Sequence, residues 1–263
     1  MTTPAAARVP ASLVRAWEAA VAFAFPLACA ACECPLGTHE HGLVCGTCWN
    51  SCRRLGAPRC DRCGHPARAG ATACDWCPLL PAHVRAVRSW CWVGDGAGAA
   101  IVHALKYRGW HAVADGMADR LARLDWPDDV RRERCCLVPV PLAPDRARAR
   151  GFNQAERLAS ALAPRWGIPS RTDLLRRARA GPRAESQTRL TPTERSGNVR
   201  DCFVSPKNAH AELRGAHVIL VDDVVTTAAT LNACAAELVA AGARIVSYVT
   251  FGRARAIRDR FAS

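Results

Sequence analysis

The stretch HVILVDDVVTTAATL, from His217 to Leu231, joins an apolar run to two adjacent carboxylates and a row of threonines. A short, uninterrupted apolar run before Asp222 is typical of a strand that is buried on both faces of a parallel sheet. The small hydroxyl residues after Asp223 stand where such a strand turns into a helix. The stretch therefore predicts a buried strand whose carboxyl end carries a polar site.

Strands and helices alternate on both sides of this stretch. The pattern predicts strands at residues 84–93, 135–140, 217–221 and 243–251, and helices at residues 96–109, 153–167 and 228–242. This alternation indicates an α/β fold, in which a parallel sheet carries helices on both faces. Ligands of such sheets bind at the carboxyl ends of the strands, so both aspartates are expected at the mouth of the sheet.

The loop after the aspartates has the properties of a phosphate cradle. Backbone N–H groups at the start of a helix are unpaired and carry partial positive charge. Hydroxyl donors flank two small residues in the order Thr226, Thr227, Ala228, Ala229 and Thr230. The two aspartates would repel a phosphate, but they suit sugar hydroxyls, with a divalent cation shared by the rest of the ligand. The pattern predicts a ribose carrying a 5′-phosphate; the alternative is an acidic helix cap beside an ordinary loop.

Ten of the fifteen cysteines fall before residue 78, and eight of these form four Cys-x-x-Cys turns. The turns are Cys29 with Cys32, Cys45 with Cys48, Cys60 with Cys63, and Cys74 with Cys77. Two such turns close one tetrahedral four-sulfur site, so the series predicts two structural zinc ions. A closed site leaves no position for a substrate, and the module is expected to recognise rather than catalyse. Changing Cys60 to Ser is expected to unfold it while sparing the sheet domain.

Several assignments within this module stay open in the sequence. A redox Cys-x-x-Cys occurs singly on a thioredoxin-like frame, which the pattern here lacks. The letters CAACEC leave open a slip of one ligand from Cys32 to Cys34, and sequential or crosswise pairing of the turns cannot be read. Cys34 and Cys52 are otherwise bystanders, and the five cysteines after residue 78 are expected to be small buried residues.

The chain carries a formal net charge of +13, and residues 131–195 hold fifteen arginines against six acidic residues. A field of this sign attracts polyanions such as nucleic acid or phosphorylated substrates. The alternative is a solvated basic face without a ligand.

The first 28 residues are interpreted as a leader that contains an amphipathic helix from Pro10 to Phe25. The segment resembles a signal peptide, but Glu18 interrupts its apolar run, and cleavage near Ala30 would remove or unseat Cys29. No run of 18 uncharged apolar residues exists that could span a membrane. We expect a cytoplasmic protein.

Several stretches together resemble the ComF family, which is associated with competence and DNA uptake. VILVDDVVTTAAT resembles the ribose-5-phosphate signature of type I phosphoribosyltransferases, which bind phosphoribosyl pyrophosphate. Other hallmarks are the double zinc ribbon and the stretches ALKYRG (104–109), VPVPLAPDRARARGFNQAERLA (138–159) and SQTRLTPTERSGNVRDCF (186–203). After the leader (1–28), the resemblance implies a double zinc ribbon domain (29–80) and a phosphoribosyltransferase-like domain (84–263) with a parallel sheet.

One residue departs from the family's signature. Glycine normally follows the two threonines, and Ala228 stands there in this chain. Because alanine disfavours positive φ, the loop is expected to keep a negative φ at this position, with a lower phosphate affinity as one consequence.

The resemblance also implies where the leaving pyrophosphate lies, together with a magnesium ion. Arg146, Arg148 and Arg150 are the candidate partners of this anion, because guanidinium groups suit phosphate oxygens; a solvated basic loop is the alternative. Lys106 is expected to reach pyrophosphate or merely a helix end. A long loop at residues 178–201 is expected to close over the site.

Two classes of function remain open. The first is an enzyme in which Asp222 and Asp223 hold the ribose, and the 5-phosphoribosyl group is transferred to an acceptor that no stretch identifies. The second is a module that senses phosphoribosyl pyrophosphate or handles single-stranded DNA with proteins of DNA uptake. Stacking aromatic residues would support the second class. The candidates are Trp49, Trp76, Trp90, Trp92, Tyr107 and Trp110.

Overall fold

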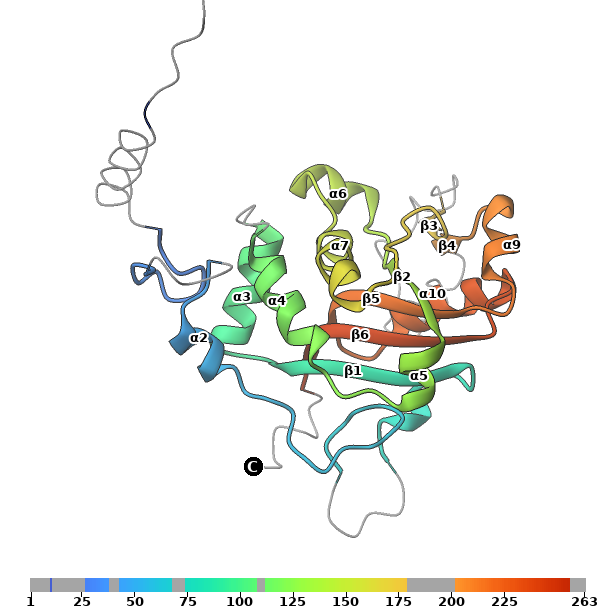
Figure 1. Ribbon diagram of the computed structural model, residues 1–263, viewed down its shortest axis with the longest axis horizontal. Helices are drawn as coiled ribbons and strands as arrows, with labels where there is room; N and C mark the ends of the chain where they lie inside the picture. Colours follow the sequence, from blue (N-terminus) through green and yellow to red (C-terminus); the bar gives the residue numbers. More distant parts are fainter. Residues whose placement is uncertain are drawn as a thin grey trace, which may run out of the picture.

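The computed structural model describes residues 27–37, 43–67, 74–107, 112–178 and 202–255, together with Pro10 (Figure 1). The predicted helix from Pro10 to Phe25 and nearly all of the predicted loop at 178–201 lie outside the described residues.

A four-stranded parallel sheet forms the centre of the molecule, in the order β1-β6-β5-β2. Its strands are β1 (Val84–Val93), β2 (Arg134–Pro139), β5 (His217–Val225) and β6 (Ile245–Ala254). The predicted α/β class with a parallel sheet is therefore confirmed. The predicted end of β5 at residue 221 is wrong, because the strand continues through both aspartates. Asp222 pairs with Thr250 of β6, and Val224 pairs with Gly252.

Helices cover both faces of this sheet (Figure 1). Helices α3 (Ala97–Tyr107), α4 (Ala112–Ala122) and α7 (Gln154–Trp166) cover one face, and α10 (Ala229–Ala240) covers the other. Helix α7 begins where the Asn153 side chain accepts a hydrogen bond from the Ala155 amide, and it ends at Gly167, whose φ is 65°. The remaining elements are α2 (Gly46–Ser51), η1 (Cys77–Leu79), α5 (Asp128–Glu133), α6 (Pro144–Arg150), β3 (Arg176–Arg177), β4 (Phe203–Val204), η4 (Lys207–Ala209) and α9 (His210–Leu213).

The two cysteine-rich segments pack against opposite faces of the sheet. Trp49 of the first segment shares a core with α3, α4 and α7, and a Cβ added to Gly116 of α4 would lie only 2.8 Å from its ring. Trp76 of the second segment shares the other core with α10. The chain between them runs along the edge strand, where the Trp92 amide donates to Arg53 at 2.8 Å. The ribbons are therefore parts of the two cores rather than a separate globule.

In the described part of the chain, every helix is too short or too polar to cross a lipid bilayer.

Candidate functional site

A pocket lies where β5 ends and α10 begins. Its lining consists of Asp222 and residues 224–231, which include the predicted Thr226, Thr227, Ala228, Ala229 and Thr230. The loop places all three threonines of this group on the exposed side of the molecule. Because α10 starts at residue 229, its first N–H groups face this pocket without partners in the preceding turn. The residues predicted for the cradle therefore line one pocket, and their binding of a phosphate stays a prediction.

The two aspartates point to opposite faces of the sheet, as adjacent residues of a strand must. Asp222 faces the pocket, and its Oδ1 accepts a hydrogen bond from the Asp223 amide at 2.8 Å. Burial, followed by the neighbouring Asp223 carboxylate, raises the pKa of Asp222 well above its ordinary value. An ionised Asp222 is thus poorly compensated by the protein, and it can gain from hydroxyl donors supplied by a ligand.

Asp223 faces α3 and α7 and is 4% exposed. The ammonium group of Lys106 lies 2.5 Å from its Oδ2, and the Gln154 side-chain amide donates to Oδ1 at 3.3 Å. The sequence predicts that Lys106 contacts pyrophosphate or a helix end, and in the structure its ammonium group pairs with the carboxylate of Asp223. This ion pair compensates the buried charge of Asp223.

The polar cluster continues from Gln154 to α6. Arg150 donates to the Gln154 Oε1 and to the Tyr107 hydroxyl, both at 3.0 Å, and its guanidinium lies 4.7 Å from the centre of the Tyr107 ring. Arg150 is thus connected to Asp223 through one side chain. Arg146 and Arg148 are exposed on α6, and Arg148 is paired with Asp145. Of the three predicted arginines, the structure brings Arg150 into the cluster.

The sequence did not single out Gln154, and it indicated Tyr107 only as a candidate for stacking on nucleic-acid bases. Both lie inside the stretches that carry the family resemblance, next to residues that were singled out. Their role depends on contacts between α3, α6 and α7, which no local pattern encodes. A signal was present, however, because Gln154 is a polar residue on a face of α7 that otherwise contributes apolar residues to the core.

The backbone at Ala228 contradicts the expectation of a negative φ. Ala228 has φ 62° and ψ 6°, the left-handed conformation, and it directly precedes α10. Its carbonyl accepts a hydrogen bond from the Asn232 amide at 2.8 Å, so the conformation is part of the helix start. The loop keeps the backbone that glycine would favour, and alanine bears a steric cost of about 1 kcal/mol for it.

Ala228→Gly is therefore expected to raise the free energy of unfolding by about 1 kcal/mol or slightly less, because glycine also gains entropy in the unfolded chain. Ala229→Gly is the matched control, since residue 229 is helical and glycine costs up to about 1 kcal/mol in a helix. Chemical denaturation of the three proteins measures both effects. Equal destabilisation by the two glycines would contradict the left-handed assignment.

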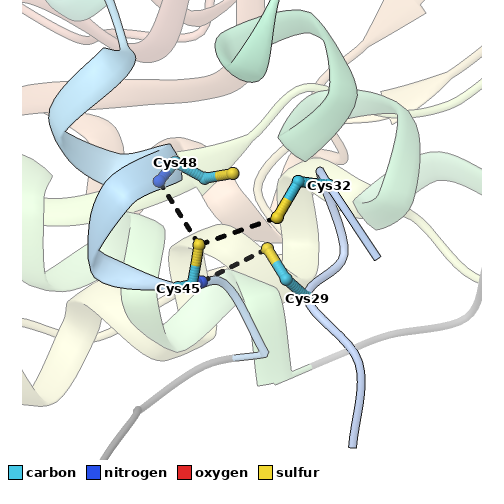
Figure 2. A group of neighbouring side chains, drawn as sticks. All are labelled: Cys29, Cys32, Cys45 and Cys48. Carbon is cyan, nitrogen blue, oxygen red and sulfur yellow. Dashed lines mark hydrogen bonds between the residues drawn. The ribbon is translucent and has the colours of Figure 1, made fainter. Parts of the chain in front are cut away.

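The eight predicted metal ligands form two compact clusters. One contains Cys29, Cys32, Cys45 and Cys48, and the other contains Cys60, Cys63, Cys74 and Cys77; within each, all sulfur atoms lie within 4.8 Å of one another. Figure 2 shows the first cluster, whose side chains converge from two turns of the chain. The pairing of turns is sequential, and Cys34 stands outside the cluster. This settles two assignments that the sequence left open.

The clusters fit zinc by distance and by donor chemistry. Tetrahedral coordination with Zn–S bonds of about 2.3 Å separates the sulfurs by about 3.8 Å. The Sγ atoms of Cys32 and Cys45 are 3.8 Å apart, and those of Cys60 and Cys77 are 3.4 Å apart. Burial opposes ionisation of Cys29, but hydrogen bonds, foremost from the Cys45 amide at 3.3 Å, outweigh it and lower its pKa to about 6. Such N–H donors suit thiolate ligands.

Two family models match the chain. The model described as a double zinc ribbon domain covers residues 20–78, and the model described as a phosphoribosyl transferase domain covers residues 148–260.

Relatives match over different parts of the chain. The DNA utilization protein YhgH of Salmonella typhimurium is 29% identical over 233 residues, which cover 84% of this chain and 94% of that protein. Competence protein ComFC of Bacillus subtilis is 40% identical over 106 residues, which cover 40% of this chain and 39% of that protein. Among solved structures, glutamine phosphoribosylpyrophosphate amidotransferase from B. subtilis matches with a TM-score of 0.39 and 18% identity, over 57% of this chain and 30% of that one.

The order of the two matched domains agrees with the order of the structural features, in which two four-cysteine clusters precede the strand that ends at Asp222. The family resemblance rests on the same residues that form the clusters and the pocket. The chain joins a double zinc ribbon to a phosphoribosyl transferase domain, and it is similar to a DNA utilization protein and to a competence protein.

Proposed function

We propose that the protein binds phosphoribosyl pyrophosphate with magnesium and transfers its 5-phosphoribosyl group to an acceptor. The observation that carries this proposal is the pocket of Asp222 and residues 224–231, which joins a carboxylate to a helix start and three hydroxyl donors. These are the groups that a ribose and its 5′-phosphate need at the same time. The matched transferase domain supports the same ligand.

The roles follow from position. The loop N–H groups and the threonine hydroxyls hold the 5′-phosphate, and Asp222 accepts hydrogen bonds from the ribose hydroxyls. When the acceptor attacks C1, the bond from C1 to the pyrophosphate oxygen breaks and the electron pair leaves with the pyrophosphate. Lys106 pairs with the site carboxylate Asp223, and Arg150 is connected to the same carboxylate through Gln154. These two cations stabilise the departing anion. Magnesium would supply further charge neutralisation on the pyrophosphate when it is bound.

Thiol ligands must stay reduced to hold zinc, and the chain has fifteen cysteines. We therefore place the protein in a reducing compartment such as the cytoplasm.

Calorimetric titration of the purified protein with phosphoribosyl pyrophosphate, in the presence and absence of magnesium, tests binding. A screen of nucleobases and amines for pyrophosphate release then tests transfer. Magnesium-dependent binding together with acceptor-dependent release supports an enzyme. Binding without release from any acceptor would leave a sensor, and the absence of binding would overturn the proposal.

A second candidate function is the handling of single-stranded DNA. The names of the relatives refer to DNA utilization and competence, and the net charge of +13 favours a polyanion. The structure reduces the number of aromatic residues that could stack on DNA bases, because Trp49, Trp76 and Trp90 are buried. Trp92 is half-buried, with the Arg255 guanidinium 5.9 Å from its ring centre, and Tyr107 is 61% exposed. Trp110 lies outside the described residues.

If this candidate is right, the affinity for single-stranded DNA is expected to fall log-linearly with salt, with a slope of about −0.7 for each phosphate contacted. Arg146→Gln is expected to reduce the magnitude of that slope by somewhat less than one, because Arg146 is an exposed cation of α6. Fluorescence anisotropy over a salt series measures both. A flat salt response of the wild type would remove nucleic acid as a partner.

A further inference from the structure

Asn232 joins the phosphate loop to the second zinc ribbon. It lies in the first turn of α10, and its backbone amide donates to the carbonyl of the left-handed Ala228 at 2.8 Å. Its side-chain nitrogen donates to the carbonyl of Leu79 at 2.8 Å. Leu79 belongs to η1, the single turn that begins at the metal ligand Cys77. One residue therefore holds the loop backbone on one side and the turn of a zinc ligand on the other.

The amide of Asn232 is held in this orientation by a second partner. The Tyr248 hydroxyl donates to the Asn232 Oδ1 at 3.0 Å, so the side-chain nitrogen must face Leu79. Tyr248 is fully buried in β6 and provides a fixed anchor. The turn is itself closed by hydrogen bonds, since the Leu80 amide donates to the Cys77 carbonyl at 3.0 Å. A displacement of Cys77 would thus move the Leu79 carbonyl in the same turn, and with it the hydrogen-bonded side chain of Asn232.

Hydrophobic packing also connects the second zinc ribbon with the phosphate loop. Cys63, Trp76 and Leu80 of the second ribbon belong to one hydrophobic core with Ala228 and Leu231, which line the pocket. The first ribbon belongs to the opposite core, with α3, α4 and α7. The two ribbons are therefore unequal with respect to the phosphate loop, although their metal clusters are alike.

We infer that the zinc ion of the second ribbon supports the phosphate loop, and that Asn232 is the positioning residue that couples them. This inference rests on the proposed function of the loop. Zinc holds Cys77 and its turn in place, Leu79 then fixes the Asn232 amide, and Asn232 keeps the start of α10 aligned with Ala228. Because coupling between two binding sites is reciprocal, a ligand in the phosphate loop must also tighten the second zinc site by the same factor.

The first test uses two variants that separate the contacts of Asn232. Asn232→Leu keeps the size of the side chain and its neutrality but removes both hydrogen bonds. Tyr248→Phe is the matched control, because it removes the bond to Tyr248 and leaves the bond to Leu79. Loss of one neutral hydrogen bond corresponds to about three- to tenfold in affinity. Calorimetric titration with magnesium and phosphoribosyl pyrophosphate is expected to show that weakening for Asn232→Leu and near wild-type affinity for Tyr248→Phe.

The second test needs no variant. A zinc chelator is titrated against the wild type with and without saturating phosphoribosyl pyrophosphate, and alkylation of the released thiols is mapped by peptide mass spectrometry. The ligand is expected to protect the second set (Cys60, Cys63, Cys74 and Cys77) by about three- to tenfold and to leave the first set (Cys29, Cys32, Cys45 and Cys48) unchanged. This readout concerns zinc occupancy and does not depend on turnover.

The outcomes distinguish this inference from the proposed function. If the wild type does not bind phosphoribosyl pyrophosphate, the proposed function fails and the coupling fails with it. If the wild type binds, but the ligand protects both zinc sites equally or neither, the coupling alone is overturned. Unchanged affinity of Asn232→Leu would overturn it in the same way, and should that variant not fold, the chelator titration still decides.

Discussion

Replacing Asp222 and Asp223 together by Ala is expected to abolish magnesium-dependent binding of phosphoribosyl pyrophosphate, with a loss of at least two decades in affinity. Each charge-assisted hydrogen bond contributes about 1.5–3 kcal/mol, and the loss of two or more corresponds to a hundredfold or greater change in Kd. Single replacements sharpen the result. Asp222 lines the pocket, whereas the Asp223 carboxylate is paired with Lys106. Asp222→Ala alone is therefore expected to cause most of the loss in ligand affinity.

Asp222→Asn separates a binding defect from unfolding. Because the pKa of Asp222 is raised in the folded protein, the folded state holds a proton that the unfolded state releases, and the carboxyl makes the fold less stable as pH rises through that pKa. Asparagine removes this cost. Asp222→Asn is therefore expected to be at least as stable as wild type at neutral pH. Below the ordinary pKa of the carboxyl, where Asp222 is protonated in the folded and the unfolded state, this difference in stability is expected to disappear. Its ligand affinity is nevertheless expected to fall.

Titration calorimetry and thermal unfolding of the same preparations measure the two quantities side by side. Wild-type affinity in the double Ala variant would place the ligand elsewhere, and the enzyme proposal would fail with it. Parallel loss of binding and stability in Asp222→Asn would instead assign Asp222 a structural role.

The four strands of the central sheet, the ends of α7 and the metal clusters could be predicted because each is encoded locally. The run VILV identifies a buried strand without reference to any other residue, and Asn153 and Gly167 mark both ends of α7. The cysteine spacing limits which sulfurs can meet, although it does not say which pairs of turns close together. That choice is made by the fold, which brings the two turns of each ribbon together before the chain passes along β1.

The contacts that connect elements could not be predicted in this way. The Lys106–Asp223 ion pair joins α3 to β5, and neither residue's neighbours in sequence indicate the other. The error at Ala228 has a different cause. Local preference argues against a left-handed alanine, but the start of α10 requires that backbone, and the hydrogen bonds of the helix outweigh a cost of about 1 kcal/mol.

The interpretation of the ribbons as an independent domain also changes in the structure. Each ribbon contributes residues to a core that the sheet shares, so the sheet loses packing when a ribbon unfolds. The expectation that Cys60→Ser unfolds the ribbon and spares the sheet treated the ribbon as a module with its own core. The shared cores argue that the two parts melt together.

Removal of zinc is accordingly expected to destabilise the whole chain. The protein is expected to contain about two zinc ions per chain, and binding of a structural zinc ion contributes on the order of 10 kcal/mol in small zinc domains. A loss of even several kcal/mol corresponds to a fall in Tm of roughly 10 °C or more for a chain of this size. Calorimetric melting before and after chelation, with elemental analysis of both samples, is expected to show one transition that moves as a unit.

Arg253 of β6 links the stability of the central sheet to the second zinc site. This residue of β6 is fully buried, donates to the Cys63 carbonyl at 2.5 Å and lies 4.2 Å above the Trp76 ring. Four thiolates around one zinc ion carry a net charge of −2, which compensates this buried cation. When zinc leaves and the thiols take up protons, Arg253 keeps its charge without an anion beside it, at a cost of several kcal/mol.

Two serine variants provide the control for the chelation experiment. Cys34 is exposed and lies outside the cluster, so Cys34→Ser is expected to retain two zinc ions and the wild-type Tm. Cys60→Ser is expected to lose one zinc ion and to lower the melting of the sheet along with the ribbon, because the second cluster, Arg253 and α10 share one core. A sheet transition that stays at the wild-type temperature in Cys60→Ser would show that the ribbon unfolds alone, and the role assigned to Arg253 would then be wrong.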